Sequence, residues 1–85
     1  MDRTPIGKIT HFFDKINVAV IELTDDLSVG DTISIEGHEQ KFEQPVDSMQ
    51  IEHESIEAAK AGQAVGMKVL KPVKPNDLVF KVEAE

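Results

Sequence analysis

The chain has 85 residues, which is enough for one hydrophobic core and too few for two. Hydrophobic residues make up 40% of it and charged residues 29%, a balance typical of a folded domain rather than of a disordered segment. The absence of cysteine excludes disulfides, thiolate catalysis and cysteine-based zinc sites.

The net charge of −7 is distributed unevenly. Between residues 22 and 57, eleven acidic residues stand against a single basic one, Lys41, which gives this segment a net charge of −10. The rest of the chain carries eight basic and five acidic residues, a net charge of +3. The acidic segment repels phosphate, so counterion release cannot drive binding through it. We therefore expect no binding to DNA.

The first five residues hold one basic residue and no apolar stretch behind it, so they do not resemble a signal peptide. The longest aliphatic run, Val18 to Ile21, is far below the ~20 residues that cross a bilayer. We expect a cytoplasmic protein without a membrane partner.

Alternation of apolar and polar residues with a period of two predicts strands along most of the chain. The first two, Ile6 to Phe13 and Asn17 to Leu23, are separated by a turn and predict a hairpin. Period two places four residues of the first strand on one face: Gly7, Ile9, His11 and Phe13.

Val29-Gly30-Asp31 predicts a tight turn, with the glycine at positive φ and the aspartate capping the next amides along the chain. The turn leads into a strand from Thr32 to Glu36, after which Gly37 breaks the pattern.

The next predicted strand runs from about Lys41 to His53 and contains Pro45, which cannot donate a ladder hydrogen bond. Val46 is out of phase with Met49, so we expect a bulge or bend that returns both side chains to one buried face.

Ser55 to Gly62 is the only helix-like stretch, with a capping serine, three alanines and a terminal glycine, and it predicts a one-turn helical connector. Val65, Met67 and Val69 then alternate as a strand, and we expect Gly62 and Gly66 to mark places where a side chain would obstruct a neighbouring backbone. The last strand contains three alternating apolar residues: Leu78, Phe80 and Val82.

These elements predict an all-β fold. We expect a small closed antiparallel β-barrel of about six to seven strands with the one-turn connector, because closure removes the unpaired edges that a small open sheet exposes. The barrel forms a single domain over residues 1–85, with a core from about residue 5 to 82 and a frayed tail at residues 83–85.

Three blocks occur in a familiar order: Gly7-Lys8-Ile9 followed by L-S-V-G-D-T-I-S-I at 27–35, then V-D-S-M-Q-I-E-H-E at 46–54, then A-K-A-G-Q-A-V-G at 59–66. Together they resemble the second domain, a β-barrel, of translational GTPases of the elongation factor Tu and 1-alpha type. The chain looks like a stand-alone translation elongation factor-like protein.

The departures from that family concern function. No G-x-x-x-x-G-K-[ST] motif is present, so GTP hydrolysis is excluded. The resemblance implies a pocket for the aminoacylated end of transfer RNA, and the family's pocket glutamate corresponds here to Gln50. His53 matches the second histidine of the family block, whereas Lys68 stands where an apolar or neutral residue is expected.

The residues give no catalytic or metal site. His11, His38 and His53 lie on separate elements, and neighbouring residues of a strand point to opposite faces, so His53 and its glutamate neighbours cannot share one ion without a bend. No serine lies in a G-x-S-x-G elbow, and the carboxylates are typical of a solvated face. We expect no enzyme activity, no cofactor and no metal.

Two features are candidates for binding. Phe12 and Phe13 are neighbours on a strand, so at least one side chain is expected to leave the core, where a loop covers it or it stacks on a base or anchors a partner. The last third of the chain gathers four lysines, joined by Lys8 if the first and last strands pair. These lysines would meet RNA phosphates or an acidic protein, or simply protect an edge strand: Lys68, Lys71, Lys74 and Lys81.

The leading hypothesis is a non-catalytic binding module that contacts the ribosome, transfer RNA or a translation factor. The alternative is a protein-interaction or accessory barrel that has lost its role in translation, such as the partner of a collagenase-like peptidase, since similar barrels are appended to such enzymes. The acidity of the chain, Gln50 and Lys68 favour the alternative.

Overall fold

Ten strands make up the secondary structure in the described residues (4–37, 40–52 and 54–82) of the chain, for which we analysed a computed structural model. They are β1 (Gly7–Phe13), β2 (Val18–Leu23), β3 (Leu27–Ser28), β4 (Thr32–Glu36), β5 (Lys41–Pro45), β6 (Met49–Ile51), β7 (Glu54–Ile56), β8 (Ala58–Ala59), β9 (Ala64–Lys68) and β10 (Leu78–Val82). The predicted all-β class is confirmed. His53 and the predicted frayed tail, residues 83–85, lie outside the described residues.

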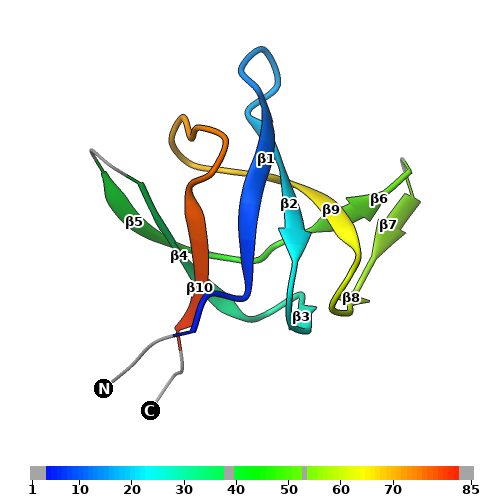
Figure 1. The fold of residues 1–85 in the computed structure, drawn as a ribbon. Coiled ribbons are helices and arrows are strands. Elements are labelled where there is room, and N and C mark those ends of the chain that lie inside the picture. The colour runs from blue at the N-terminus through cyan, green and yellow to red at the C-terminus, as the bar shows by residue number, and fades with distance from the viewer. Residues whose placement is uncertain (1–3, 38–39, 53, 83–85) are drawn as a thin grey trace.

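Eight of the strands form one sheet in the order β5-β4-β10-β1-β2-β9-β6-β7, and β3 and β8 form a second, two-stranded sheet (Figure 1). All pairings are antiparallel. The first and last long strands, β1 and β10, are neighbours, and Lys8 lies opposite Leu78. The β1–β2 hairpin is also as predicted, and its tip extends beyond the rest of the sheet.

The closed barrel of six to seven strands is wrong. Within the described part of the chain, β5 and β7 stand at the two ends of the strand order and each pairs with one neighbour, so the sheet is open. The strands β3, β7 and β8 were not predicted, because they have two or three residues each, too few to show an alternating pattern, and β6 is the part of the predicted strand 41–53 that follows the bend.

The helical connector is also wrong. Residues 54–56 form β7, Ala58–Ala59 form β8, and a turn follows that reaches Gly62 at a φ of 91°. A helix of one turn gains few internal hydrogen bonds for the residues it orders. Strand pairing instead places Ile56 opposite Met49 and buries Ala59, so tertiary contacts override the helix propensity of the alanines.

A β-bulge changes the faces of β1. The register with β2 shifts between Ile9, opposite Ile21, and His11, opposite Val20, so Thr10 is the extra residue. Ile9 is fully buried, but beyond the bulge His11 and Phe13 are exposed and Phe12 packs against the core. The prediction that Ile9 shares a face with His11 and Phe13 is therefore wrong.

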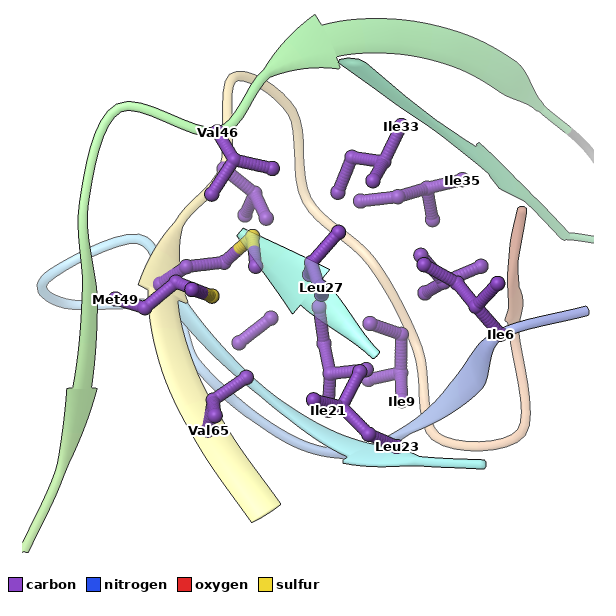
Figure 2. Packing of buried hydrophobic residues seen from close by; sticks show 14 of the residues in the cluster. Ile6, Ile9, Ile21, Leu23, Leu27, Ile33, Ile35, Val46, Met49 and Val65 are labelled. Carbon is purple, nitrogen blue, oxygen red and sulfur yellow. The ribbon is translucent and has the colours of Figure 1, made fainter. Parts of the chain in front are cut away.

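The core lies against the inner face of the curved sheet (Figure 2). The predicted bend exists: β5 ends at Pro45 and β6 begins at Met49, and both Val46 and Met49 are buried. The buried hydrophobic residues come from nearly all parts of the described chain: Ile6, Ile9, Ala19, Ile21, Leu23, Leu27, Ile33, Ile35, Phe42, Val46, Met49, Ala59, Val65, Met67, Val69, Val73 and Val79.

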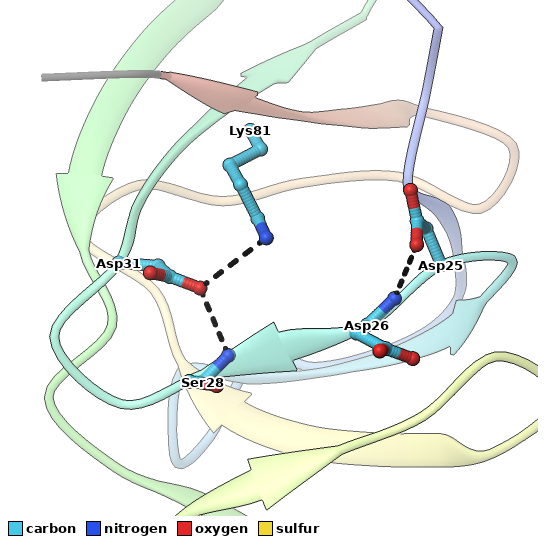
Figure 3. A network of polar contacts seen from close by, with 5 residues as sticks. All are labelled: Asp25, Asp26, Ser28, Asp31 and Lys81. Carbon is cyan, nitrogen blue, oxygen red and sulfur yellow. Dashed lines mark hydrogen bonds and ion pairs between the residues drawn. The ribbon is translucent and has the colours of Figure 1, made fainter.

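The turn at Gly30 and Asp31 is as predicted, but the Asp31 side chain caps an amide that precedes it rather than the next ones. Gly30 has a φ of 100°, and the Asp31 carboxylate accepts a hydrogen bond of 3.0 Å from the backbone N–H of Ser28 (Figure 3). The same carboxylate lies 3.6 Å from the Nζ of Lys81, so this ion pair connects the turn to β10.

Side chains, rather than a ladder, join the edge strand β5 to the segment after β9. The side-chain amide of Gln44 donates to the backbone oxygen of Lys68 over 2.8 Å and accepts from the backbone N–H of Leu70 over 2.9 Å. Gln40 donates to the backbone oxygen of Pro72 in the same way, next to β5. We call this junction of residues 40–44 with residues 68–72 the seam.

Candidate binding surface

One end of the molecule brings together three segments that are far apart in sequence: Asn17 in the β1–β2 turn, residues 44–48 from the end of β5 onward, and residues 67–70 from the end of β9 onward. Val18 lies opposite Lys68 in the β2–β9 pair, and the backbone N–H of Val69 donates to the oxygen of Asn17 over 2.9 Å. We call the surface of these three segments the loop end.

A hollow of about 380 Å³ opens at the loop end. Its buried wall includes Met67 and Gln44, and its rim includes Leu70. The full lining draws on all three segments: Asn17, Gln44, Pro45, Asp47, Ser48, Met67, Lys68, Val69 and Leu70. The hollow is thus a mixed polar and apolar depression at the surface, beside the core rather than inside it.

Gln44 holds the shape of this hollow. The residue is only 4% exposed, and both polar atoms of its amide are bonded to the backbone at 68–70. A primary amide can replace a peptide group in this role because it offers one donor and one acceptor side by side. The rim of the hollow is therefore fixed by the same bonds that make the seam.

One exposed large hydrophobic side chain, that of Leu70, lines the hollow. Leu70 is 72% exposed and Ile16 is 57% exposed, the two highest values among the large hydrophobic residues that the structure describes. Phe13 is 45% exposed and lies opposite Val18, which in turn lies opposite Lys68. The ring of Phe13 stacks at a tilt on that of His11, with 4.9 Å between centroids. Of the two predicted phenylalanines, Phe13 faces out and Phe12 packs against the core.

The four predicted lysines do not form one patch. Lys68 lines the hollow, and Lys71 and Lys74 follow in the same loop, where the Lys71 Nζ lies 5.9 Å from the centre of the Phe42 ring. Lys81 instead pairs with Asp31 on another part of the molecule. The loop lysines are accompanied by Asp47 in the hollow.

Gln50 belongs to a different region. It is exposed on β6 opposite Gly66 and does not line the hollow. His53, the other residue taken from the family resemblance, lies outside the described residues. The structure thus joins only Lys68 of the predicted set to the hollow.

Sequence reasoning missed Leu70, Ile16 and Gln44. Leu70 breaks the alternation of Val65, Met67 and Val69, and Ile16 is an apolar residue in a predicted turn. Both positions therefore indicated, weakly, that the side chain is exposed. Gln44 is polar at a buried position that alternates with Phe42. No local pattern reveals that its amide finds partners 24 and 26 residues further on.

The described residues hold no cluster of metal ligands and no buried side-chain polar atom without a partner. Across the described ranges, no group of three or more histidine, cysteine, aspartate or glutamate residues could hold a metal ion. Every buried side-chain nitrogen and oxygen within those ranges has a hydrogen-bond partner, so no polar group there is aimed at a missing ligand. The described residues contain no helix that is long and apolar enough to span a membrane.

Comparisons with known proteins point to peptidases. The chain is 45% identical over 76 residues to an uncharacterized protease, MJ0090, of Methanocaldococcus jannaschii, and the match covers 88% of this chain and 19% of that protein. It is 29% identical over 83 residues to a collagenase of Porphyromonas gingivalis, of which it covers 23%. The chain thus spans about a fifth of the length of the curated relatives it matches. No family model matches it.

The fold is that of a solved domain. The chain superposes with a TM-score of 0.88 on the C-terminal domain of a Geobacillus thermoleovorans protein assigned to the U32 peptidases, at 23% identity, over 93% of this chain and 100% of that one. A second structure of that domain gives a TM-score of 0.87 at 21% identity.

The identification with the second domain of elongation factors is therefore wrong, because these relatives are named for peptidases and collagenases. The three sequence blocks largely encode turns, such as Gly30-Asp31, and short strand segments. Such turn chemistry recurs wherever small antiparallel sheets need the same local geometry. The case for the ribosome, transfer RNA or a translation factor as partner depended on that identification.

Proposed function

We propose that this chain is a non-catalytic accessory module of a U32-type peptidase, which it contacts either as a separate chain or as part of the same one. The observation that carries this proposal is the 45% identity over 76 residues to a fifth of a named protease. The likeness of its fold to a domain that is itself the C-terminal part of a U32 peptidase supports it.

The composition of the site agrees with an accessory role. The described residues offer a surface hollow with exposed apolar and charged rims, which suits recognition of another protein. Hydrolysis of a peptide bond requires a positioned nucleophile, metal or acid–base pair. The catalytic groups belong, in this proposal, to the peptidase, and the module and enzyme work together in the cytoplasm.

The test uses the purified chain and the U32-type peptidase of the organism that makes it. Complex formation is measured by biolayer interferometry, and hydrolysis of a denatured protein substrate is followed with the chain alone, the peptidase alone and both. We expect a complex with a dissociation constant in about the micromolar range, as for transient interfaces of modest area. We also expect a changed rate of hydrolysis with both components and no hydrolysis by the chain alone.

The control is an unrelated acidic protein of similar size, which should neither bind nor change the rate. Absence of a complex at about 100 μM chain, beyond the range of a useful transient interface, would contradict the proposal for a separate chain. Hydrolysis by the chain alone would contradict its non-catalytic part.

A further inference from the structure

Strand β5 has one edge without a strand partner. It stands at one end of the eight-stranded order and pairs with β4 alone (Figure 1). The N–H of Val46 donates to the oxygen of Asp31 over 2.8 Å, and this bond continues the β4–β5 register. Because hydrogen-bonded and non-bonded pairs alternate along an antiparallel ladder, the even-numbered residues of 40–46 direct their backbone groups to β4. The backbone groups of Lys41 and Glu43 therefore point away from β4.

These outward groups are available to another strand. Within the described ranges, no hydrogen bond joins the outward backbone groups of Lys41 and Glu43 to another part of the chain, and both residues are exposed. Unpaired N–H and C=O groups on a sheet edge are a template for a further strand. Charged residues and proline often protect such an edge. Here Pro45 removes a donor at one end only, and Lys41 and Glu43 have opposite charges, so the edge selects little by charge.

The seam leaves the outer side of this edge open. Period two places the side chains of Gln40 and Gln44 on the same face of β5 as the buried Phe42, and from there they bond to the backbone at 68–72. Exposed residues stand on both sides of the seam: Lys41, Glu43 and Pro45 along β5, and Lys68, Leu70 and Pro72 along the facing segment. The hollow of about 380 Å³ lies between them, at the Pro45 end, with the buried Gln44 in its lining.

We propose that a stretch of unfolded polypeptide adds to β5 as a further strand at the seam and is held there as a substrate of the peptidase. This inference rests on the proposed function, to which it adds the class of ligand. The N–H and C=O groups of Lys41 and Glu43 form the backbone hydrogen bonds, and one side chain of the added segment enters the hollow beside Leu70. Strand addition recognises the main chain and therefore accepts many sequences, which suits a module that serves a peptidase.

Two other arrangements fit the structure less well. A second copy of the chain would bring together two molecules that carry −7 each and repel one another, whereas an unfolded segment of low net charge is not repelled. The opposite edge of the sheet, β7, has three residues, and the carbonyl of Glu57 just beyond it already accepts from the N–H of Val29 over 2.8 Å. Strand β5 is thus the longer and freer edge.

The test uses the purified 85-residue chain and a labelled peptide of about nine residues, in which valine and threonine alternate between a terminal lysine and a terminal glutamate. Fluorescence anisotropy measures binding. We expect a dissociation constant of about 0.1–1 mM, since few hydrogen bonds form. The same peptide with methylated backbone nitrogens keeps its side chains but loses its N–H donors, so it should bind at least about tenfold more weakly.

A proline at position 43 tests the edge itself. Glu43→Pro removes an outward N–H that takes no part in the ladder with β4, and Glu43→Ala removes the same side chain but keeps that N–H. We expect Glu43→Pro to weaken peptide binding at least about tenfold and Glu43→Ala to weaken it less than about threefold. Circular dichroism melts establish that both variants fold.

Hydrogen exchange of the unaltered chain gives a second readout that needs no variant. At a peptide concentration about ten times the dissociation constant, the amides of Lys41 and Glu43 should exchange about tenfold more slowly than in the free chain, because the added strand accepts or covers them. Unchanged exchange of both amides in the presence of bound peptide would place the peptide elsewhere and overturn the inference.

The outcomes separate the two proposals. If the chain binds the peptidase but binds no peptide at about 5 mM, or if Glu43→Pro binds the peptide as tightly as Glu43→Ala, this inference is overturned while the proposed function stands. A dimer that Glu43→Pro dissolves identifies a second copy as the occupant of the edge and also overturns it. If the peptide binds as expected but no complex with the peptidase forms, the proposed function for a separate chain is overturned, together with the role of the bound segment as a substrate.

Discussion

The side-chain amide of Gln44 offers the sharpest test of how this fold is held together. Replacing it by leucine, Gln44→Leu, keeps most of the side-chain volume but removes both hydrogen bonds to residues 68–70. The oxygen of Lys68 and the N–H of Leu70 then lose their partner. An unsatisfied buried polar group costs about 1–3 kcal/mol, and these two lie at a rim that water reaches in part, which favours about 1–1.5 kcal/mol for each.

We therefore expect Gln44→Leu to lower the free energy of unfolding by about 2–3 kcal/mol. For a chain of this size the total is ~4–13 kcal/mol, so the loss is a large fraction of it. It corresponds to a fall in Tm of roughly 8–24 °C, given 4–8 °C per kcal/mol for small domains. Urea unfolding and thermal melts followed by circular dichroism measure both quantities.

The matched control is the same substitution at an exposed glutamine, Gln50→Leu on β6, which should change the free energy of unfolding by less than about 0.5 kcal/mol. Hydrogen exchange adds a local readout, since the amide of Leu70 should exchange faster in Gln44→Leu than in the native chain. Equal stability of the two variants, with unchanged protection of that amide, would refute the account of the seam.

Three further predictions follow from the structure. Gly7→Ala should lower the free energy of unfolding by about 1–3 kcal/mol, because the added Cβ would lie 2.8 Å from the backbone oxygen of Glu22. Gly66→Ala should be tolerated, since the nearest contact of its Cβ would be 3.5 Å, and urea unfolding of both variants measures the difference. Asp31→Ala should cost about 1 kcal/mol through loss of the bond to Ser28, and Asp31→Asn, which keeps an acceptor, should cost less in the same assay. The chain should unfold as one unit, with coincident transitions by near- and far-ultraviolet circular dichroism and no separate step for the β6–β7 hairpin.

Alternation was enough to predict the all-β class, the β1–β2 hairpin and the bend after Pro45, because each leaves a local trace in the sequence. The bulge at Thr10 leaves none, since one inserted residue is invisible until the register with β2 is known. Gly62 and Gly66 show a related limit. The expectation that both avoid a backbone clash is wrong, because Gly62 has open space and a φ of 91°, and Gly66 would accept a Cβ.

The candidate site was harder to predict than the fold. The sequence shows the lysines of residues 68–74 as a group. It does not show that Leu70, Asn17 and Gln44 line one hollow together with Lys68. Those contacts join segments separated by more than 20 residues, and they follow from the curvature of the sheet rather than from any local motif. Lys81 was grouped with the others for the same reason, since sequence proximity does not show that it reaches Asp31 instead.

The seam links the stability of the fold to the binding surface. The edge strand of an open sheet leaves backbone groups without a partner strand. Next to β5, the side chain of Gln44 bonds to the backbone at 68–70, so this segment is held by a side chain rather than by a further strand ladder. The residues fixed in this way form the rim of the hollow, where the side chain of Leu70 is exposed. A partner that contacts Leu70 therefore stabilises the same segment on which the sheet depends, by about 2.7 kcal/mol when present at a hundred times its dissociation constant. The fold and its candidate function thus depend on one pair of hydrogen bonds, and a weakened seam should weaken docking even though Gln44 itself is buried.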